Sequence, residues 1–147
     1  MFAKRIVIRD SVVSDVAELT LLINELGYYT LESEMKERYE IISTNPDYKT
    51  IVAVIGTEVV GMAGLCKGMF YEKNGMYMRI LAFVVKQTWR NHGVGKILLV
   101  ASEKWAIEQG LNMILLNSGN RDERNDAHAF YKEMGYTVKS SGYVKQL

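Results

Sequence analysis

The segment covering residues 76–110 constrains the fold most, because its hydrophobic period changes part-way along. Residues 76–85 form a β-prone run, which predicts a strand. A short polar loop follows. Two glycines then open a stretch whose apolar residues recur at helical spacing: Val94, Ile97, Leu98, Ala101 and Trp105. Gly110 ends that predicted helix. A strand that passes directly into an amphipathic helix indicates a sheet with helices packed on it.

Three further helices are expected. The first follows a Ser14-Asp15 cap and stops at Gly27, and the second follows a Thr30 cap and ends before Pro46. The third covers residues 125–134 and stops at Gly135. The apolar faces of the first two are expected to hold Val16, Leu19, Leu22, Ile23 and Leu26, and then Leu31, Met35, Tyr39 and Ile42.

Strands are expected at residues 6–8, 50–55, 58–67, 76–85, 113–116, 136–139 and 143–146. Gly56-Thr57 and Asn74-Gly75 predict turns between neighbouring strands. The expected order is β-α-α-β-β-β-α-β-α-β-β, which indicates an α/β fold with a mixed (α+β) sheet covered by helices. A length of 147 residues suits one domain over residues 1–147.

Composition excludes several classes of protein. The chain has 18 basic and 17 acidic residues, a net charge of +1, whereas nonspecific nucleic-acid binders are usually far more basic. It has one cysteine and two histidines, so neither an internal disulfide nor a structural zinc site is expected. No apolar run suits a signal peptide or a membrane span, so the expected location is the cytoplasm, with no membrane or nucleic-acid partner.

The loop between the predicted strand and helix has the properties of an anion site. A helix start presents unpaired backbone N–H groups and a partial positive charge, and glycines let a ligand approach the backbone. Two glycines alone would fit a tight turn equally well. Here basic residues stand at the same end, in the run Arg90-Asn91-His92-Gly93-Val94-Gly95-Lys96, which favours phosphate.

This run differs from two common phosphate motifs. It is not a P-loop, because Ile97 rather than Ser or Thr follows Lys96. It is not a dinucleotide-binding fingerprint either, because Leu98 occupies the position of the third glycine. The remaining pattern, Arg-x-x-Gly-x-Gly at a strand-to-helix junction, resembles the pyrophosphate loop of the GNAT superfamily of N-acetyltransferases. Val85, Trp89 and Arg90 match that loop, and Gln87 stands where the family usually has proline.

A second segment carries the same resemblance. The run from Asn125 to Tyr136 is similar to the family pattern Asn-x-x-Ala-x-x-Phe-Tyr-x-x-x-Gly-Phe. By this resemblance, Asn125 would bind the pantetheine arm of coenzyme A, and Tyr131 would protonate the leaving thiolate. The alternative is that Phe130 and Tyr131 are core aromatics beside a glycine helix stop.

The resemblance implies a GNAT-like fold and a reaction. The parallel strands at 76–85 and 113–116 would splay apart, and pantetheine would bind the main chain at Phe83, Val84 and Val85. The diphosphate would bind the loop residues, namely Arg90, Asn91, His92, Gly93, Val94, Gly95 and Lys96. Acetyl-CoA would then transfer its acetyl group directly to a primary amine in a ternary complex. Relatives are often homodimers.

The sequence identifies neither the general base nor the amine acceptor. Many relatives carry a glutamate on the strand before the loop, but this chain reads Arg79-Ile80-Leu81-Ala82 there. Glu32, Glu34 and Glu72 are alternatives to it, but for each of them a solvated surface charge is the favoured interpretation. Tyr28, Tyr29 and Arg79 are the candidate acceptor residues. Core packing is an equally good interpretation of the two tyrosines, and Arg79 would favour a carboxylate or phosphate on the acceptor.

The sequence gives less support to other catalytic residues and other functions. Cys66 lies in an apolar strand, where a core role is favoured over an acyl-carrier role. His92 is expected to touch phosphate or solvent, and His128 to lie on the surface, with no part in proton transfer. The missing strand glutamate leaves a second hypothesis, a non-catalytic acyl-CoA-binding regulatory module. An interaction domain for nucleic acid or protein is disfavoured by the balanced charge.

Overall fold

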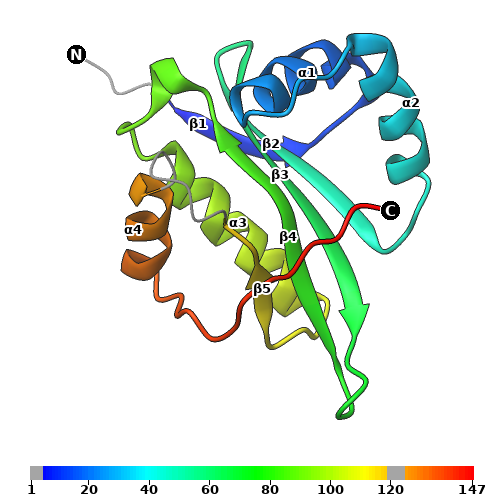
Figure 1. The fold of residues 1–147 in the computed structure, drawn as a ribbon. Helices are drawn as coiled ribbons and strands as arrows, with labels where there is room; N and C mark the ends of the chain where they lie inside the picture. The colour runs from blue at the N-terminus through cyan, green and yellow to red at the C-terminus, as the bar shows by residue number, and fades with distance from the viewer. Residues whose placement is uncertain (1–4, 119–124) are drawn as a thin grey trace. The chain divides into compact units, whose positions relative to one another are not determined.

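The computed structural model of the protein describes residues 5–118 and 125–147. Two compact units divide the chain, Met1–Leu115 and Leu116–Leu147. In chain order, the elements of Figure 1 are β1 Ile6–Asp10, the 3₁₀ turn η1 Val13–Asp15, α1 Val16–Glu25, α2 Glu32–Ser43, β2 Tyr48–Ile55, β3 Glu58–Met69, β4 Met76–Val85, the 3₁₀ turn η2 Gln87–Trp89, α3 Val94–Glu108, β5 Ile114–Leu116 and α4 Asn125–Glu133.

The strands form one mixed sheet in the order β1-β2-β3-β4-β5. The first four pair antiparallel, and the predicted turn between β2 and β3 is present, with Gly56 at φ 64°. A glycine accepts that left-handed conformation without a Cβ clash. The chain leaves β4 through η2 and α3 before it forms β5, so the helix crosses one face of the sheet between two neighbouring strands.

The sheet is buried on both faces in the first unit. Side chains from α1, α2, β2, β3 and β4 form one core cluster: Val16, Leu19, Leu22, Met35, Tyr39, Val52, Val59, Met62 and Val84. Figure 1 shows α3 on the opposite face. A Cβ on Gly61 of β3 would lie 3.5 Å from both Val94 and Leu98 of α3 and 3.1 Å from the Val84 carbonyl oxygen. The tightest of these contacts is with β4, so a side chain at this position would crowd the Val84 carbonyl, while its contacts with α3 would be ordinary.

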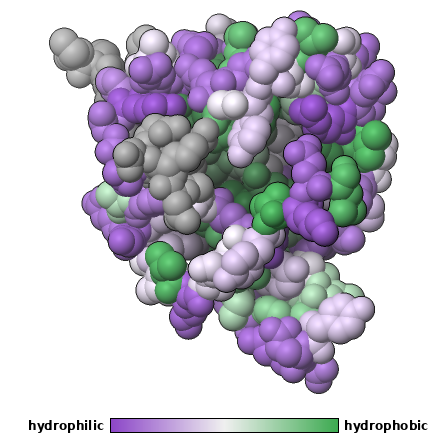
Figure 2. Space-filling model, viewed as in Figure 1, coloured by the Kyte–Doolittle hydropathy of each residue, from purple (hydrophilic) through white to green (hydrophobic). Residues whose placement is uncertain are grey.

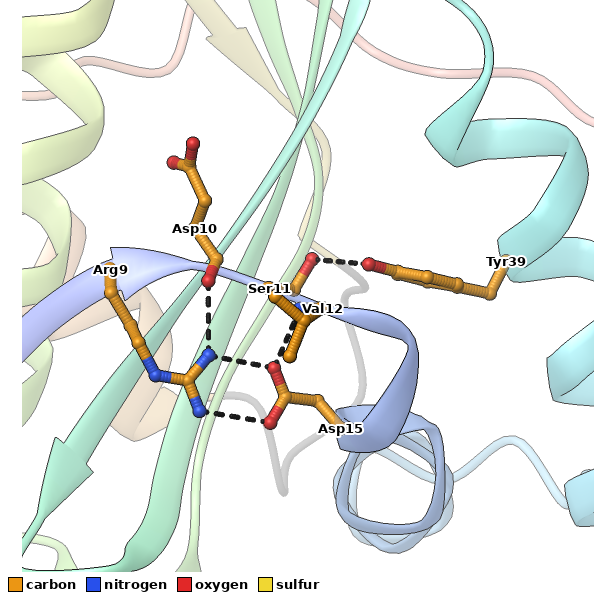
Figure 3. Close-up of polar contacts among 6 residues, drawn as sticks. All are labelled: Arg9, Asp10, Ser11, Val12, Asp15 and Tyr39. Atoms are coloured by element: carbon orange, nitrogen blue, oxygen red, sulfur yellow. Dashed lines mark hydrogen bonds and ion pairs between the residues drawn. The ribbon is translucent and has the colours of Figure 1, made fainter.

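The junction between β1 and α1 is held by a buried carboxylate (Figure 3). Arg9 donates to both oxygens of Asp15, at 2.8 and 2.9 Å, and the Val12 N–H donates to the same carboxylate at 2.8 Å. The Arg9 hydrogen bond is the main reason that the pKa of Asp15 lies below its usual value, against the opposing effect of burial. We call Arg9 and Asp15 the N-terminal latch.

The start of α2 differs from the prediction. Thr30 was expected to cap the helix, but its N–H donates to the Asn24 side chain at 2.9 Å, and its own side chain does not cap α2. The Leu31 N–H instead donates to the Glu34 carboxylate at 2.9 Å, which satisfies a donor at the helix start. Leu31 was expected to be buried on this helix, but it is the extended N-cap residue before α2 and is 50% exposed.

The buried face of α3 is rotated from the one predicted. Val94 and Leu98 are buried as expected, but Ile97 is exposed, and Ser102 lies fully inside. The Ser102 hydroxyl donates to the Leu98 carbonyl at 2.9 Å, so this polar side chain is satisfied within its own helix. Hydrophobicity alone therefore assigned the wrong residues to part of this face.

The two terminal strands expected at 136–139 and 143–146 are not formed; residues 136–147 have no regular secondary structure. Tyr143 and Val144 are 94% and 98% exposed. A β-prone segment forms a strand where its backbone pairs with a neighbouring strand and its side chains are buried. The side chains of this segment are not buried.

The β3–β4 hairpin projects beyond the core. Its loop holds Phe70 against Tyr77, with ring centroids 5.1 Å apart, and Gly75 takes a positive φ of 116°. Polar and apolar side chains lie side by side at its tip, at the bottom of Figure 2. None of the helices among the described residues is long and apolar enough to cross a membrane.

Candidate cofactor-binding site

The backbone between β4 and α3 turns through two left-handed residues. We call residues 86–93 the β4–α3 loop. Asn91 has φ 65° and Gly93 has φ 83°, a conformation that asparagine tolerates and glycine accepts freely. A Cβ on Gly93 would meet nothing within 4 Å. The glycine is therefore required by its backbone angle, and the space beside it is open.

The first turn of α3 is suited to an anion. Gly93 is the N-cap and offers no side-chain cap, and the first turn contains no acidic residue. The Ile97 N–H donates to the Gly93 carbonyl at 3.2 Å, which starts the helical hydrogen bonds. The N–H groups of Val94, Gly95 and Lys96 precede that bond, at the positive end of the helix dipole. The exposed Lys96 side chain adds a charge there.

Arg90 is exposed and helps to hold the loop itself. Its Nε–H donates to the Val85 carbonyl at 3.2 Å, so the side chain folds back over the end of β4. A guanidinium has five N–H donors, and this bond uses one of them. The fork of this arginine therefore lies beside the loop with capacity for an oxyanion.

Carboxylates from distant parts of the chain anchor the loop. Glu58 accepts from Lys86 Nζ at 2.9 Å and from Trp89 Nε1 at 3.2 Å, and Glu25 accepts from the Gln87 N–H at 3.3 Å. The hydrogen bond to Glu58 is the largest cause that raises the pKa of Lys86, so the ammonium stays charged. The sequence analysis missed Glu58 and Glu25, because neither lies near the motif in sequence.

A hollow of about 400 Å³ adjoins the same loop. Its wall is apolar at Leu21, Leu22 and Val59, but Glu18 and Glu25 also line it, with Lys86. Lys86 is already paired with Glu58. Two carboxylates repel a phosphate group, so the first turn of α3 suits a phosphate better than this hollow does.

The strand that precedes the loop runs past its neighbour. The Met78 N–H donates to the Met113 carbonyl at 3.0 Å, and β5 ends at Leu116, whereas β4 continues to Val85. In β4, Ile80 and Ala82 oppose Leu65 and Gly64, so Leu81 is an extra, bulged residue. A bulge bends a strand and increases its twist. The bulged Leu81 is separated by Ala82 from Phe83, Val84 and Val85, of which Val84 is buried in the core.

The candidate acceptor residues lie on two elements. Tyr28 and Tyr29 follow α1 and are 65% and 84% exposed, so the alternative that they are core residues is wrong. Arg79 on β4 is half-buried, and its guanidinium carbon lies 5.9 Å from the centre of the Tyr77 ring. Of the candidate bases, Glu32 and Glu72 are exposed, and Glu34 is the carboxylate that caps α2.

Asn125 and Tyr131 belong to the second unit. Asn125 begins α4, and Tyr131 is buried, with ring centroids 5.5 Å from Phe130 and 5.9 Å from Tyr136. Gly135, at φ 95°, ends the helix as expected. His128 was expected on the surface but is half-buried. The proposed roles of Asn125 and Tyr131 stay predictions.

The two remaining side chains considered in the sequence analysis are His92 and Cys66. His92 is exposed and meets the edge of Trp89, with ring centroids 5.4 Å apart. Cys66 is half-buried, and its thiol donates to the Lys67 carbonyl at 3.3 Å. Cys66 pairs with Arg79 in the β3–β4 register, away from the α3 end of β4.

Comparison with known proteins identifies the family. Residues 16–136 match the model of the acetyltransferase (GNAT) family. The chain belongs to the GNAT acetyltransferase family. It is 30% identical over 105 residues to the uncharacterized N-acetyltransferase YhdJ of Bacillus subtilis strain 168, covering 71% of this chain and 72% of that protein. This GNAT chain is therefore an acetyltransferase by family, and acyl transfer is its general chemistry.

Solved structures support the same fold. A GNAT family acetyltransferase of Staphylococcus aureus is 39% identical and superposes with a TM-score of 0.82, over 97% of this chain and 98% of that one. A protein of Bacillus halodurans C-125 described as a transcriptional regulator is 21% identical, with a TM-score of 0.86 over 97% and 100% of the two chains. The second likeness concerns the fold alone.

Proposed function

We propose that this GNAT protein transfers the acetyl group of acetyl-CoA to a primary amine, with the cofactor diphosphate bound at the first turn of α3. One observation carries the proposal. Asn91 and Gly93 at positive φ deliver an uncapped helix start, with three successive N–H groups, directly after β4. A diphosphate would suit that arrangement, because unpaired N–H groups at a helix start bind phosphate.

The cofactor contacts follow from this placement. The N–H groups of Val94, Gly95 and Lys96 would donate to the diphosphate, with Arg90, Asn91 and His92 at its flank. Pantetheine would lie along Phe83, Val84 and Val85, where β4 extends past β5. An amide-bearing arm can pair with a strand as another strand does. Asn125 is proposed as a further contact to this arm.

The chemistry requires a neutral amine. Its nitrogen attacks the thioester carbonyl carbon, the C–N bond forms, and the C–S bond then breaks to release the thiolate. An alkyl amine has a pKa of ~10.4, so one proton must leave before attack. An N–H of residues 83–85 would stabilise the oxyanion. Tyr131 would give its proton to the sulfur and would be reprotonated by the second proton that the nitrogen loses as the amide forms. Direct attack in a ternary complex needs no acyl-enzyme on Cys66.

The proton of the amine has no carboxylate on β4 to accept it. Residues 79–82 read Arg-Ile-Leu-Ala, and Glu34 is already the cap of α2. We therefore propose that water takes this proton. Tyr28, Tyr29 and Arg79 are proposed to contact the acceptor, and Arg79 would suit an acceptor that also carries a carboxylate or phosphate.

Two assays test this function. Coenzyme A at about 100 times its Kd should stabilise the protein by about 2.7 kcal/mol, seen as a higher Tm. Acetyl-CoA with a panel of amines, including polyamines, aminoglycosides, lysine peptides and amino sugars, should release free thiol with at least one of them. No Tm shift at millimolar acetyl-CoA would refute the proposal.

Removal of the Tyr131 hydroxyl tests the acid. Tyr131→Phe should lower kcat by about tenfold, a modest effect because a thiol with a pKa of roughly 8.5 is already a fair leaving group. The Kd for coenzyme A should not change. Tyr143→Phe is the matched control, since Tyr143 is exposed. An unchanged kcat in Tyr131→Phe would remove Tyr131 from the mechanism.

A second candidate is a non-catalytic acyl-CoA-binding module, favoured by the lack of a carboxylate at residues 79–82. It predicts the same Tm shift with coenzyme A. The thiol-release assay separates the two, because this module would release no thiol with any amine.

A further inference from the structure

We propose that Glu58 is a positioning residue that sets the conformation of the β4–α3 loop and so the affinity for the cofactor. The proposal rests on the function proposed above and assigns it a residue outside the loop. We call Glu58, Lys86 and Trp89 the loop brace.

One carboxylate holds both ends of a single turn. Glu58 Oε2 accepts from Lys86 Nζ at 2.9 Å, and Glu58 Oε1 accepts from Trp89 Nε1 at 3.2 Å. Lys86 is the N-cap of η2 and Trp89 is its last residue, and the Trp89 N–H donates to the Lys86 carbonyl at 2.8 Å. Because both oxygens are used, the turn is fixed at two points to the first residue of β3.

Glu58 and Lys86 are both attached to the sheet by their backbones. Glu58 pairs with Ile55 across the β2–β3 hairpin, and the Lys86 N–H donates to the Val60 carbonyl at 2.7 Å. Val60 is fully buried. The brace therefore connects the exposed loop to the buried middle of the sheet, and a side chain locked in this way holds its partner in place.

The brace continues toward the helix start. The Trp89 ring meets His92 edge-on, with centroids 5.4 Å apart, and His92 immediately precedes Gly93. Loss of the bond to Trp89 Nε1 would loosen the indole and weaken this support for the residue next to the N-cap. The first-turn N–H groups of α3 would then bind the diphosphate less well, because they would be less preorganised.

The charges explain why a carboxylate is tolerated beside an anion site. The ammonium of Lys86 neutralises Glu58, and the same pairing keeps Lys86 protonated. Removal of Lys86 would leave a bare negative charge near the diphosphate, whereas removal of Glu58 would not. The proposal thus predicts that Lys86→Met weakens coenzyme A binding more than Glu58→Gln does.

The experiment compares Glu58→Ala, Glu58→Gln and Trp89→Phe with Glu37→Ala, which removes an exposed carboxylate from α2. Glu58→Ala should raise the Kd for coenzyme A, and the KM for acetyl-CoA, by about five- to tenfold, as expected for a lost charge-assisted hydrogen bond. The kcat should stay within about twofold. Glu58→Gln should recover part of the affinity, because an amide oxygen still accepts from Trp89.

A fluorescence measurement reads the brace directly. Trp89 and Trp105 are the two tryptophans of the chain. In a Trp105→Phe background, the free protein should show a red shift of Trp89 emission on Glu58→Ala and none on Glu37→Ala. This readout does not depend on cofactor, so it detects a loosened loop even in a variant of low affinity.

The outcomes separate the two proposals. If the unmutated protein binds no coenzyme A, the proposed function fails, and the role of Glu58 fails with it. If it binds coenzyme A, but Glu58→Ala and Trp89→Phe both keep its affinity, and Glu58→Ala leaves Trp89 emission unchanged, only the role of Glu58 is overturned. A Kd raised in Glu58→Ala with an unmoved Trp89 emission would also overturn it, because the loop would then be intact.

Discussion

Two carboxylates in this GNAT protein accept similar sets of hydrogen bonds but differ in their exposure to solvent. Asp15 in the N-terminal latch and Glu58 in the loop brace each bind one cation and one further N–H donor. The side chain of Asp15 is 7% exposed, whereas that of Glu58 is 41% exposed. Loss of the hydrogen bonds around a buried carboxylate lowers the free energy of unfolding, whereas loss of an exposed ion pair changes it little. The comparison indicates that the latch stabilises the fold, while the brace shapes a binding surface.

The largest expected effect comes from the loop that the brace supports. Gly93→Val should abolish measurable coenzyme A binding, because a β-branched residue does not hold φ 83°, and the first turn of α3 would be redirected. Isothermal titration calorimetry checks this. Gly110→Val is the matched control, since Gly110 has φ 76° at the other end of α3 and likewise has nothing within 4 Å of its Cβ position.

Both glycine variants should lose about 1–2 kcal/mol of stability from left-handed strain. Only Gly93→Val should lose the cofactor. Equal affinity for coenzyme A in the two variants would show that the loop is not the binding site.

Substitution in the N-terminal latch should lower stability without changing cofactor affinity. Asp15→Ala should lower the free energy of unfolding by about 2–3 kcal/mol, because charge-assisted bonds and a cap are lost together. Its Kd for coenzyme A should not change. Urea unfolding measures the first quantity and calorimetry the second.

Asp10→Ala provides the control for the latch. Asp10 pairs with Lys49 at 2.7 Å, but its side chain is exposed, so its removal should cost at most about 1 kcal/mol. Similar losses for Asp10→Ala and Asp15→Ala would contradict the distinction between buried and exposed pairs.

A smaller effect should appear with pH. The folded-state pKa of Asp15 is lowered, chiefly by its hydrogen bond with Arg9. The stability that this group contributes is therefore complete above its unfolded pKa of about 3.9, and it is lost as the pH falls through the lower folded pKa. The difference in unfolding free energy between the unmutated protein and Asp15→Asn should shrink over this acidic range. A difference that grows on acidification would show that the sign is wrong.

Local signals predicted much of this fold. The β2–β3 hairpin, α1 with its stop at Gly27, and the passage from β4 into α3 follow from turn residues and periodicity within a few neighbours. The errors occur where tertiary context decides. Glu34 rather than Thr30 satisfies the start of α2, Ser102 is buried through its own helix, and residues 136–147 lack the expected strands.

The site shows the same division. The Arg90-to-Lys96 run identified the uncapped helix start, because that feature is local in sequence. The brace stayed hidden, since Glu58 is 28 residues from Lys86 and 31 from Trp89. A glutamate at the first residue of a strand has no local pattern that connects it to a distant turn. Only the folded sheet brings these groups together.

The central claim is that the exposed amides at the first turn of α3 bind the cofactor diphosphate. The most direct test is an amide NMR titration with coenzyme A. The signals of Gly93, Val94, Gly95 and Lys96 should shift most among the assigned amides, and pantetheine, which lacks the diphosphate, should not move them. Unchanged signals at these four residues while coenzyme A binds elsewhere would contradict the account.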